Sequence, residues 1–354
     1  MKGLTTYLKK RKMVAGNGPI LYSRVSISRN LVGYKFGLTI KPQEKKKILS
    51  LARIAASDIE EFSGFAFFDL RRLNGLEREL LIEGNIITRP MSTKVTGRGV
   101  FVRLTDNGSN MISSVMVNEE DHFKIQALKP GWGIRDIHRR VSGLEKKLED
   151  KLSFCFDPDL GYLTSCPTMV GSGLEVSVLV HLPALVMSFK INDLIKRLNN
   201  LDCILQGYHI DGSEVLGNLF LVSKESSLKN NDIDTVEEME AICLNIIEEE
   251  NLQTEALSKD TPVSIVDNIY RSFGVLKYAR LLSFDEAIEL LSMVWLGKKL
   301  KILYNLKEFD FYRLINIIGN SYIKNYIGEK KDTEDQVDAL RADILREEIL
   351  KGND

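Results

Sequence analysis

The sequence predicts an α+β fold, in which an antiparallel sheet is flanked by helices and an all-helical domain follows. Short apolar runs separated by turn residues, typical of strands, recur as far as about residue 222. After about residue 232, helical periodicity replaces them. The chain has 354 residues, which is enough for one large domain and one smaller one. We therefore expect a lead-in at 1–19, an α+β domain at 20–255 and a helical domain at 256–354.

The expected strands and helices follow one another in a definite order. The apolar runs predict strands at about 20–27, 64–70, 100–104, 113–117, 161–166, 174–182, 203–209 and 217–222. Asn107-Gly108 is a hairpin turn signal between two of these strands. Helical spacing predicts helices at about 44–61, 134–152, 191–199, 233–258, 263–280, 284–300, 309–318 and 333–350. The helix that begins at Ile134 is strongly amphipathic, so one of its faces should be buried.

The composition excludes several classes of protein. The chain has 48 Lys and Arg against 49 Asp and Glu, which argues against nonspecific binding of nucleic acid. No apolar run reaches the 18 or so residues that span a bilayer, and the N-terminus lacks the apolar region of a signal peptide. The four cysteines have neither zinc-ligand spacing nor the density of a disulfide scaffold. We expect a soluble cytoplasmic protein with no nucleic-acid or membrane partner and no metal site built from side chains.

An acidic pentapeptide, Asn118-Glu119-Glu120-Asp121-His122, directly follows a predicted strand. Three consecutive carboxylates repel one another, so such a run is favoured where a cation is to be held. The same residues could also form a solvated acidic turn. The pentapeptide alone does not decide between these two interpretations.

Two further segments change the interpretation of the acidic pentapeptide. Residues 161–168 contain Cys166 directly before a proline, and residues 212–218 contain Glu214 after Gly-Ser. Taken singly, these are a packed cysteine and a turn. In their order and separation, with the pentapeptide, they resemble the ATP:guanidino phosphotransferase family and, within it, the bacterial protein-arginine kinases. The resemblance covers nearly the whole chain and includes segments 23–25, 28–31, 181–185 and 270–276.

The resemblance implies a protein-arginine kinase that transfers the γ-phosphoryl group of ATP, with Mg²⁺, to arginine side chains and so tags proteins for degradation. A guanidinium is protonated at cellular pH, so carboxylates are needed to grip it and to accept its proton. The implied catalytic residues are Glu119, Glu120, Cys166 and Glu214, with Cys166 as a thiolate that faces the guanidinium. The implied nucleotide-binding residues are Ser23, Arg24, Lys124 and Ser177.

The nucleotide side departs from the family pattern. Family arginines are replaced by Ser26, Lys124, Glu175 and Gln206, a family asparagine by Met169, and a family histidine by Asn85. Glu175 is the most serious change because it reverses a charge that should contact phosphate. Four other basic residues could compensate: Lys94, Arg98, Arg103 and Arg135. Two alternatives therefore stay open: a catalytically silent pseudokinase that binds arginine or phosphoarginine as an adaptor, and a kinase for small guanidines.

The resemblance also implies partners. These are proteins with exposed arginines, a zinc-containing activator protein and the Clp protease machinery, and a homodimer is compatible with the family. Residues 337–342 match a phosphoarginine-binding motif of the bacterial branch, except that Val337 replaces its first arginine. The same residues could instead form an ordinary amphipathic helix.

Overall fold

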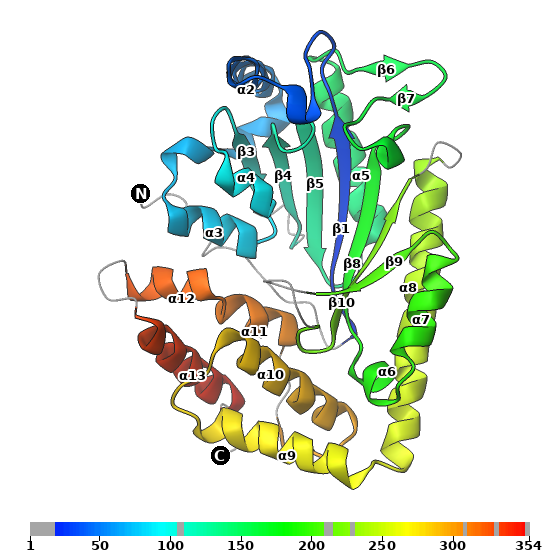
Figure 1. The fold of residues 1–354 in the computed structure, drawn as a ribbon, viewed down its shortest axis with the longest axis vertical. Helices are drawn as coiled ribbons and strands as arrows, with labels where there is room; N and C mark the ends of the chain where they lie inside the picture. Colours follow the sequence, from blue (N-terminus) through cyan, green and yellow to red (C-terminus); the bar gives the residue numbers. More distant parts are fainter. Residues whose placement is uncertain are drawn as a thin grey trace. The chain divides into compact units, whose positions relative to one another are not determined.

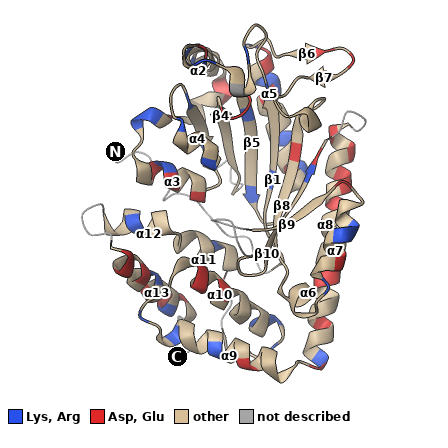
Figure 2. Ribbon diagram, in the orientation of Figure 1, with Lys and Arg blue, Asp and Glu red and all other residues tan. Residues whose placement is uncertain are grey.

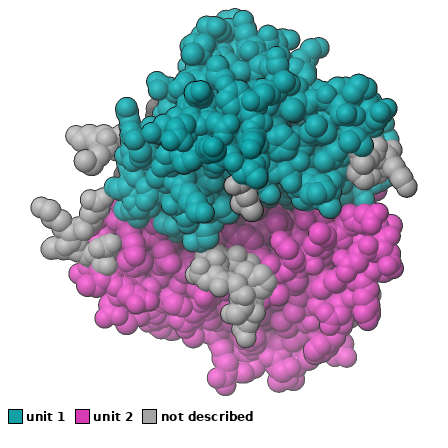
Figure 3. All heavy atoms as spheres, turned by 45° about the horizontal axis from the view of Figure 1, so that its top comes forward, with its two compact units in different colours: residues 1–12, 23–177, 224–240 teal, residues 13–22, 178–223, 241–354 magenta. Residues whose placement is uncertain are grey.

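The computed structural model describes residues 18–104, 110–208, 215–226, 231–306, 310–328 and 333–350. Its contacts divide the chain into two compact units, coloured separately in Figure 3. Unit 1 contains Ser23–Ser177 and Lys224–Glu240, and unit 2 contains Val178–Ser223 and the chain from Ala241 onward. The boundary between the two units passes through strands of the sheet. The sequence-based domain boundaries stay a prediction.

Eight strands of the described residues form one sheet (Figure 1). In sheet order they are β2 (Ala66–Asp69), β3 (Gly99–Arg103), β4 (Ile112–Val117), β5 (Phe123–Pro130), β1 (Ile20–Arg29), β8 (Leu174–His181), β10 (Leu219–Glu225) and β9 (Ile204–Gly207). The pairs β2–β3, β3–β4, β4–β5 and β9–β10 are antiparallel. The predicted α+β class is confirmed.

Helix α5 (Ile134–Glu149) packs against β5 in unit 1. Its apolar residues are buried, as the amphipathic pattern predicts: Ile134, Ile137, Val141, Leu144 and Leu148. Most of the charged residues between them are exposed, whereas Arg140 and Glu145 are largely buried and pair with Glu61 and Arg29. Lys146 and Lys147 lie in the last turn, where positive charge interacts favourably with the helix dipole.

Three further helices lie in unit 1. These are α2 (Pro42–Ser57), α3 (Gly75–Glu83) and α4 (Arg89–Thr93). A buried cluster joins Leu81 of α3 and Met91 of α4 to Val100 of β3 and Met116 of β4. This cluster fixes α4 beside the strands that carry the acidic pentapeptide.

The strand expected at 161–166 is only partly present. Strand β7 (Gly161–Tyr162) pairs with β6 (Phe156–Asp157), and a short 3-10 helix follows at Pro167–Met169. Gly161 has a φ of 78°, and a Cβ there would lie 2.7 Å from the carbonyl oxygen of Gly171. Only glycine fits this close approach, and the next residue, Tyr162, forms an isolated bridge with Gly171. The predicted turn at Asn107-Gly108 lies outside the described residues.

Helices dominate the rest of the chain. They are α6 (Pro183–Met187), α7 (Ile191–Asn199), α8 (Asp232–Lys259), α9 (Val263–Tyr278), α10 (Phe284–Lys299), α11 (Phe311–Ile317), α12 (Asn320–Ile327) and α13 (Glu334–Leu350). Acidic residues are frequent along α8 (Figure 2). Helix α10 packs against α9 and is buried from Leu291 to Gly297, so it forms the core of this helical part. Among the described residues, no helix is long and apolar enough to cross a membrane.

Candidate active site

The acidic pentapeptide forms the tight turn between β4 and β5. Asn118 adopts a left-handed backbone conformation with a φ of 61°, which asparagine tolerates better than most residues. Its N–H donates to the carbonyl oxygen of His122 over 2.9 Å. Its side-chain amide donates to the carbonyl oxygens of Gly97 and Lys45, at 2.6 and 2.9 Å. Asn118 therefore sets the path of the turn.

Arg98 holds the same turn from the neighbouring loop. Its Nε donates to the carbonyl oxygen of Asn118 over 2.7 Å, and its Nη2 donates to that of Glu119 over 3.1 Å. A third N–H is bonded to the carbonyl oxygen of Pro90. The side chain is 7% exposed. Arg98 is thus committed to the backbone and does not replace a missing phosphate-binding arginine.

Asp121 and His122 connect the turn to two other segments of the predicted site. The carboxylate of Asp121 accepts hydrogen bonds from Asn30, at 2.6 Å, and from the N–H and hydroxyl of Ser165, both at 2.7 Å. His122 Nδ1 accepts the N–H of Leu31 over 2.9 Å, so Nε2 carries the proton that faces the carbonyl oxygen of Lys35. Burial lowers the pKa of His122, in agreement with a neutral ring. Asp121 fixes the position of the Cys166 loop beside the turn.

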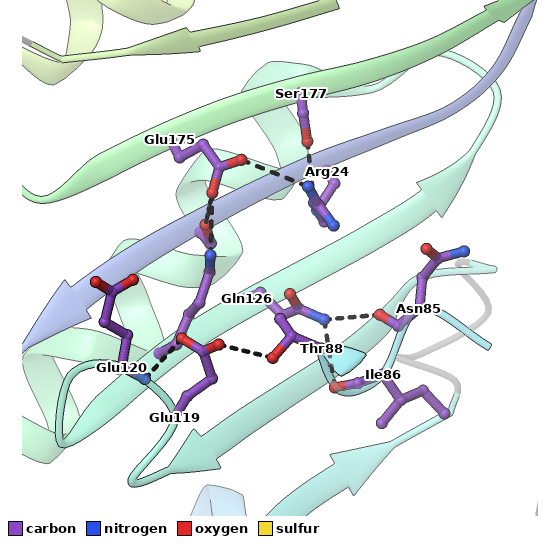
Figure 4. Close-up of polar contacts among 11 residues, drawn as sticks. Arg24, Asn85, Ile86, Thr88, Glu119, Glu120, Gln126, Glu175 and Ser177 are labelled. Atoms are coloured by element: carbon purple, nitrogen blue, oxygen red, sulfur yellow. Dashed lines mark hydrogen bonds and ion pairs between the residues drawn. The ribbon is translucent and has the colours of Figure 1, made fainter. Parts of the chain in front are cut away.

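Glu119 and Glu120 have different surroundings (Figure 4). The Glu119 carboxylate accepts the hydroxyl of Thr88 over 2.6 Å and the N–H of Glu120 over 2.9 Å. No described group makes a hydrogen bond to the Glu120 carboxylate. Burial, and then the charges of Glu119 and Asp121, raise the pKa of Glu120, although Lys124 opposes the shift. A carboxylate with a raised pKa is a better proton acceptor near neutral pH.

Cys166 lies at the start of the 3-10 helix, next to the loop that Asp121 holds. Its sulfur is 3.1 Å from the hydroxyl oxygen of Thr168, and that hydroxyl donates to Glu225 over 2.7 Å. Asp121, the neighbour of Glu120, bonds Ser165, the neighbour of Cys166, so the structure links the two segments that carry Glu120 and Cys166. The fourth predicted catalytic residue, Glu214, lies outside the described residues.

Two of the predicted nucleotide-binding residues lie on strands β1 and β5 and meet a carboxylate (Figure 4). Glu175, on β8, pairs with Arg24 over 3.5 Å and with Lys124 over 3.1 Å. It also accepts the hydroxyl of Ser26 over 3.2 Å. Arg24 Nε donates to Ser177 over 2.9 Å. Because β5, β1 and β8 are adjacent in the sheet, these side chains share one small cluster.

Glu175 keeps its charge in this cluster. Burial alone would raise its pKa, but Lys124, Arg24 and the hydrogen bonds from Lys124 and Ser26 lower it to about 2. One carboxylate against two cations leaves a net charge of +1 on these side chains. A polyphosphate at this place competes with Glu175 for both cations, so the residues present fit a nucleotide phosphate less well than an all-arginine set.

The other residues named from the sequence have separate surroundings. Ser23 is fully buried and donates to the carbonyl oxygen of Gly131 over 2.9 Å, so its hydroxyl is engaged by the backbone. Arg135, one of the basic residues that could replace a missing phosphate-binding arginine, forms ion pairs with Glu240 and Glu237 instead. The carbonyl oxygen of Asn85 accepts the side-chain amide of Gln126. Within the described ranges, no group of three or more His, Cys, Asp or Glu side chains could hold a metal ion.

The fold and the acidic turn define a class of protein, the guanidino phosphotransferases, and comparisons with known proteins agree. A family model for the ATP:guanido phosphotransferase C-terminal catalytic domain matches residues 47–253. A second model, the protein-arginine kinase McsB C-terminal domain, matches residues 262–354. The chain belongs to the ATP:guanido phosphotransferase family.

Named relatives align over almost the full chain. A protein-arginine kinase of Pelotomaculum thermopropionicum is 32% identical over 93% of this chain and 92% of its own length. One of Bacillus mycoides is 31% identical over 94% of both chains. The duplicated taurocyamine kinase of Schistosoma mansoni has the same fold, with a TM-score of 0.60 at 20% identity, over 78% of this chain and 40% of that chain. Lombricine kinase has a TM-score of 0.55 at 18% identity, over 65% of this chain and 66% of that chain.

Proposed function

We propose that this chain is an ATP-dependent protein-arginine kinase. The observation that carries the proposal is the match to protein-arginine kinases along more than nine tenths of the chain, which includes the C-terminal part found in the bacterial branch. The acidic turn supports it, because Glu120 is a carboxylate with a raised pKa and no hydrogen-bond partner among the described residues. Such a group can bond a guanidinium and accept its proton.

Each site residue has a distinct role in this proposal. Glu120 grips and deprotonates the guanidinium together with Glu214, and Glu119 positions Glu120 through its bond to the Glu120 N–H. Cys166 lies beside the same turn. Arg24 and Lys124 contact the phosphates of ATP, with Mg²⁺ held mainly by phosphate oxygens and water. The partners follow the same proposal: proteins with exposed arginines, a zinc-containing activator and the Clp protease machinery.

Direct detection of the product tests the proposal. The purified protein is incubated with ATP, Mg²⁺ and an arginine-rich protein, and the digest is searched for acid-labile phosphoarginine by mass spectrometry. We expect phosphoarginine that depends on ATP. Its absence at high ATP concentration, with the protein folded, would contradict the proposal.

One observation favours a second candidate, a silent binding module that keeps the guanidinium site. Glu175 is ion-paired with both Arg24 and Lys124, the two residues that would contact the phosphates of ATP. If this pairing excludes ATP, calorimetry should find weak binding to the wild type and tighter binding to the double variant Ser26→Arg/Glu175→Arg. Tight Mg²⁺-dependent binding by the wild type, with no gain in the double variant, would exclude the silent module.

A further inference from the structure

Thr88 occupies the N-cap position of helix α4, but its side chain makes no capping hydrogen bond. A threonine at this position usually accepts an N–H of the first helical turn, which stabilises the helix by about 1 kcal/mol. The Thr88 hydroxyl is instead bonded to Oε1 of Glu119 over 2.6 Å (Figure 4). The side chain is therefore engaged by the acidic turn and not by its own helix.

The Glu119 carboxylate is held at both of its oxygens. An ionised carboxylate can only accept hydrogen bonds, so the Thr88 hydroxyl is the donor to Oε1. The other oxygen, Oε2, accepts the N–H of Glu120 over 2.9 Å. The two neutral donors together fix the plane of the carboxylate. Loss of the Thr88 donor would let the carboxylate rotate away from the N–H of Glu120.

The segment that ends at Thr88 is held by the two strands on either side of the acidic turn. On β5, the side-chain amide of Gln126 donates to the carbonyl oxygen of Asn85 over 2.8 Å. On β4, the hydroxyl of Ser114 donates to the carbonyl oxygen of Ile86 over 3.3 Å, and Ile86 itself is buried. The strands that carry the turn therefore also set the place of the hydroxyl that bonds it.

A second connection joins α4 to the turn, and it holds the backbone instead of the carboxylate. Arg98 donates to the carbonyl oxygen of Pro90 in α4 and to those of Asn118 and Glu119. This connection keeps α4 against the turn whether or not Thr88 has its hydroxyl. Removal of that hydroxyl should therefore leave the path of the chain unchanged and affect the orientation of the Glu119 carboxylate.

We propose that Thr88 is a positioning residue of the guanidinium site. Its hydroxyl orients the Glu119 carboxylate, which holds the N–H of Glu120 and so sets where the Glu120 carboxylate meets the guanidinium. The inference rests on the proposed function, because Thr88 acts here through the proposed proton acceptor. Thr88 lies 31 residues before Glu119, outside the motifs that predict the site. Small displacements of a reacting group lower the rate strongly, so such support matters for catalysis.

The test compares the wild type with Thr88→Val, which keeps the shape of the side chain without the donor, and with Thr88→Ser, which keeps a donor. The rate of phosphoarginine formation on an arginine-rich protein is measured as a function of ATP concentration. We expect kcat of Thr88→Val to be at least about tenfold lower, the effect of one hydrogen bond to a charged group. Thr88→Ser should recover most of the wild-type kcat. KM for ATP should change little in either variant, because Arg24 and Lys124 lie on β1 and β5.

Two controls separate the orientation of Glu119 from a general loss of stability. Thr93→Val removes a hydroxyl from the other end of α4, where it bonds the carbonyl oxygen of Pro90 over 3.1 Å, and should leave kcat unchanged. In a Glu119→Ala background, Thr88→Val should have little further effect, because the carboxylate that it orients is absent. Thermal melts establish that each protein is folded at the assay temperature. Equal kcat in Thr88→Val and the wild type, no recovery in Thr88→Ser, or an undiminished effect in Glu119→Ala would overturn the proposal.

Calorimetric binding of a short peptide with one arginine, in the absence of ATP, decides the case in which the wild type forms no phosphoarginine. Thr88→Val should bind the peptide about tenfold more weakly than the wild type, whereas Thr88→Ser and Thr93→Val should bind it equally well. With that order of affinities and no phosphoarginine, the positioning role stands and the kinase proposal fails. Equal peptide binding by Thr88→Val and the wild type, or no binding by any of the proteins, would then contradict both.

Discussion

The five side chains of the turn between β4 and β5 differ in what they contact. Asn118 bonds the backbone of neighbouring segments, Asp121 bonds the Cys166 loop, and His122 bonds Leu31, just after the end of β1. Glu119 is bonded to Thr88 and to the next N–H. The Glu120 carboxylate makes no hydrogen bond to any described group. The cost of placing three carboxylates together is therefore offset by bonds at two of them, and the third keeps a raised pKa.

The first prediction concerns Glu120→Gln. Because the Glu120 carboxylate has no hydrogen-bond partner among the described residues, its loss should leave thermal stability nearly unchanged. Removal of a proton acceptor should lower the rate of phosphoarginine formation by about 10²- to 10⁴-fold. Steady-state kinetics and a thermal melt measure the two effects. Asp121→Ala is the contrasting variant, since it should lower stability through its lost bonds to Asn30 and Ser165. Near-normal turnover by Glu120→Gln would remove Glu120 from the mechanism.

The second prediction is the pH dependence of kcat at saturating ATP. Glu120 must be deprotonated to act as a base, and its pKa is raised, first by burial. The rate should therefore fall on the acid side at a pH above that of an ordinary glutamate. Lys124 opposes the raised pKa, so Lys124→Met should move the acid limb to still higher pH. An acid limb at the same pH in both proteins would show that Glu120 does not control it.

The sequence predicts that the acidic turn and Cys166 lie in one site. It does not predict the ion pairs of Glu175. The motif order places the acidic turn and Cys166 in one site, and the structure joins them through Asp121. The pairing of Glu175 with Arg24 and Lys124 was not predictable from sequence spacing. These residues are 151 and 51 positions apart, and only the order of strands β5, β1 and β8 brings them together.

At the level of elements, long periodic segments were predicted well, and most of the missed elements are short. Helix α5 and the strands β1, β3, β4 and β8 lie close to their predicted ranges. Strand β5 was missed because it is buried on both sides, with the burial pattern broken only at Lys124 and Lys129, so it shows no clear alternation. The short helices α3, α4, α6 and α12 were missed too. Helices this short carry few turns, so their periodicity is a weak signal, although α7 and α11, of nine and seven residues, were predicted.

The third prediction concerns the cap of α6. Glu250, on α8, is 1% exposed and accepts the N–H groups of Ala184 and Leu185 at 2.8 and 3.0 Å. Burial raises its pKa to about 7, against these two hydrogen bonds. The folded state therefore holds a proton that the unfolded chain, with a value near 4.5, releases. This contribution to stability is complete below about pH 4.5 and is lost as the pH rises to about 7.

Glu250→Gln should remove this pH dependence. Relative to the wild type, the variant should gain stability between pH 5 and pH 8 by an amount on the order of 3 kcal/mol. Thermal melts at both pH values measure it. The matched control is Glu249→Gln, because Glu249 is the neighbouring residue and makes an exposed pair with Arg197. The same stability difference at both pH values would contradict the assignment.

The fourth prediction concerns Arg341 in α13. Its side chain is fully buried and donates to the carbonyl oxygens of Leu282, at 2.6 Å, and Ile318, at 3.0 Å, and to the side chains of Asp338 and Asn320. Arg341→Ala should destabilise the helical part by about 3–5 kcal/mol, because these acceptors lose their donor. Chemical denaturation measures the loss.

The exposed Arg280→Ala is the control for Arg341→Ala and should change stability by less than about 0.5 kcal/mol. The burial of Arg341 also favours the amphipathic-helix interpretation of residues 337–342, since four hydrogen bonds already occupy its guanidinium. Free phosphoarginine should therefore not raise the melting temperature of the protein. A clear increase that Arg341→Lys abolishes would show that this segment binds the ligand.

For the molecule as a whole, the catalytic and helical parts match the two family models in order, at residues 47–253 and 262–354. Motif order and spacing were sufficient to predict this membership, because several segments along the chain agreed. What they could not supply is the balance of charges on the nucleotide side. There, Glu175 forms ion pairs with both Arg24 and Lys124, and we expect this pairing to raise the ATP concentration that the proposed kinase needs.

The most direct measurement is the rate of phosphoarginine formation as a function of ATP concentration, in the wild type and in Glu175→Gln. The neutral amide of the variant cannot carry the charge that competes with phosphate for Arg24 and Lys124. We predict phosphoarginine from both proteins, with half-maximal rate in the variant at an ATP concentration at least about tenfold lower, which corresponds to about 1.4 kcal/mol. Failure of both proteins to form phosphoarginine at saturating ATP would contradict the account. An unchanged ATP requirement in Glu175→Gln would contradict the role assigned to Glu175.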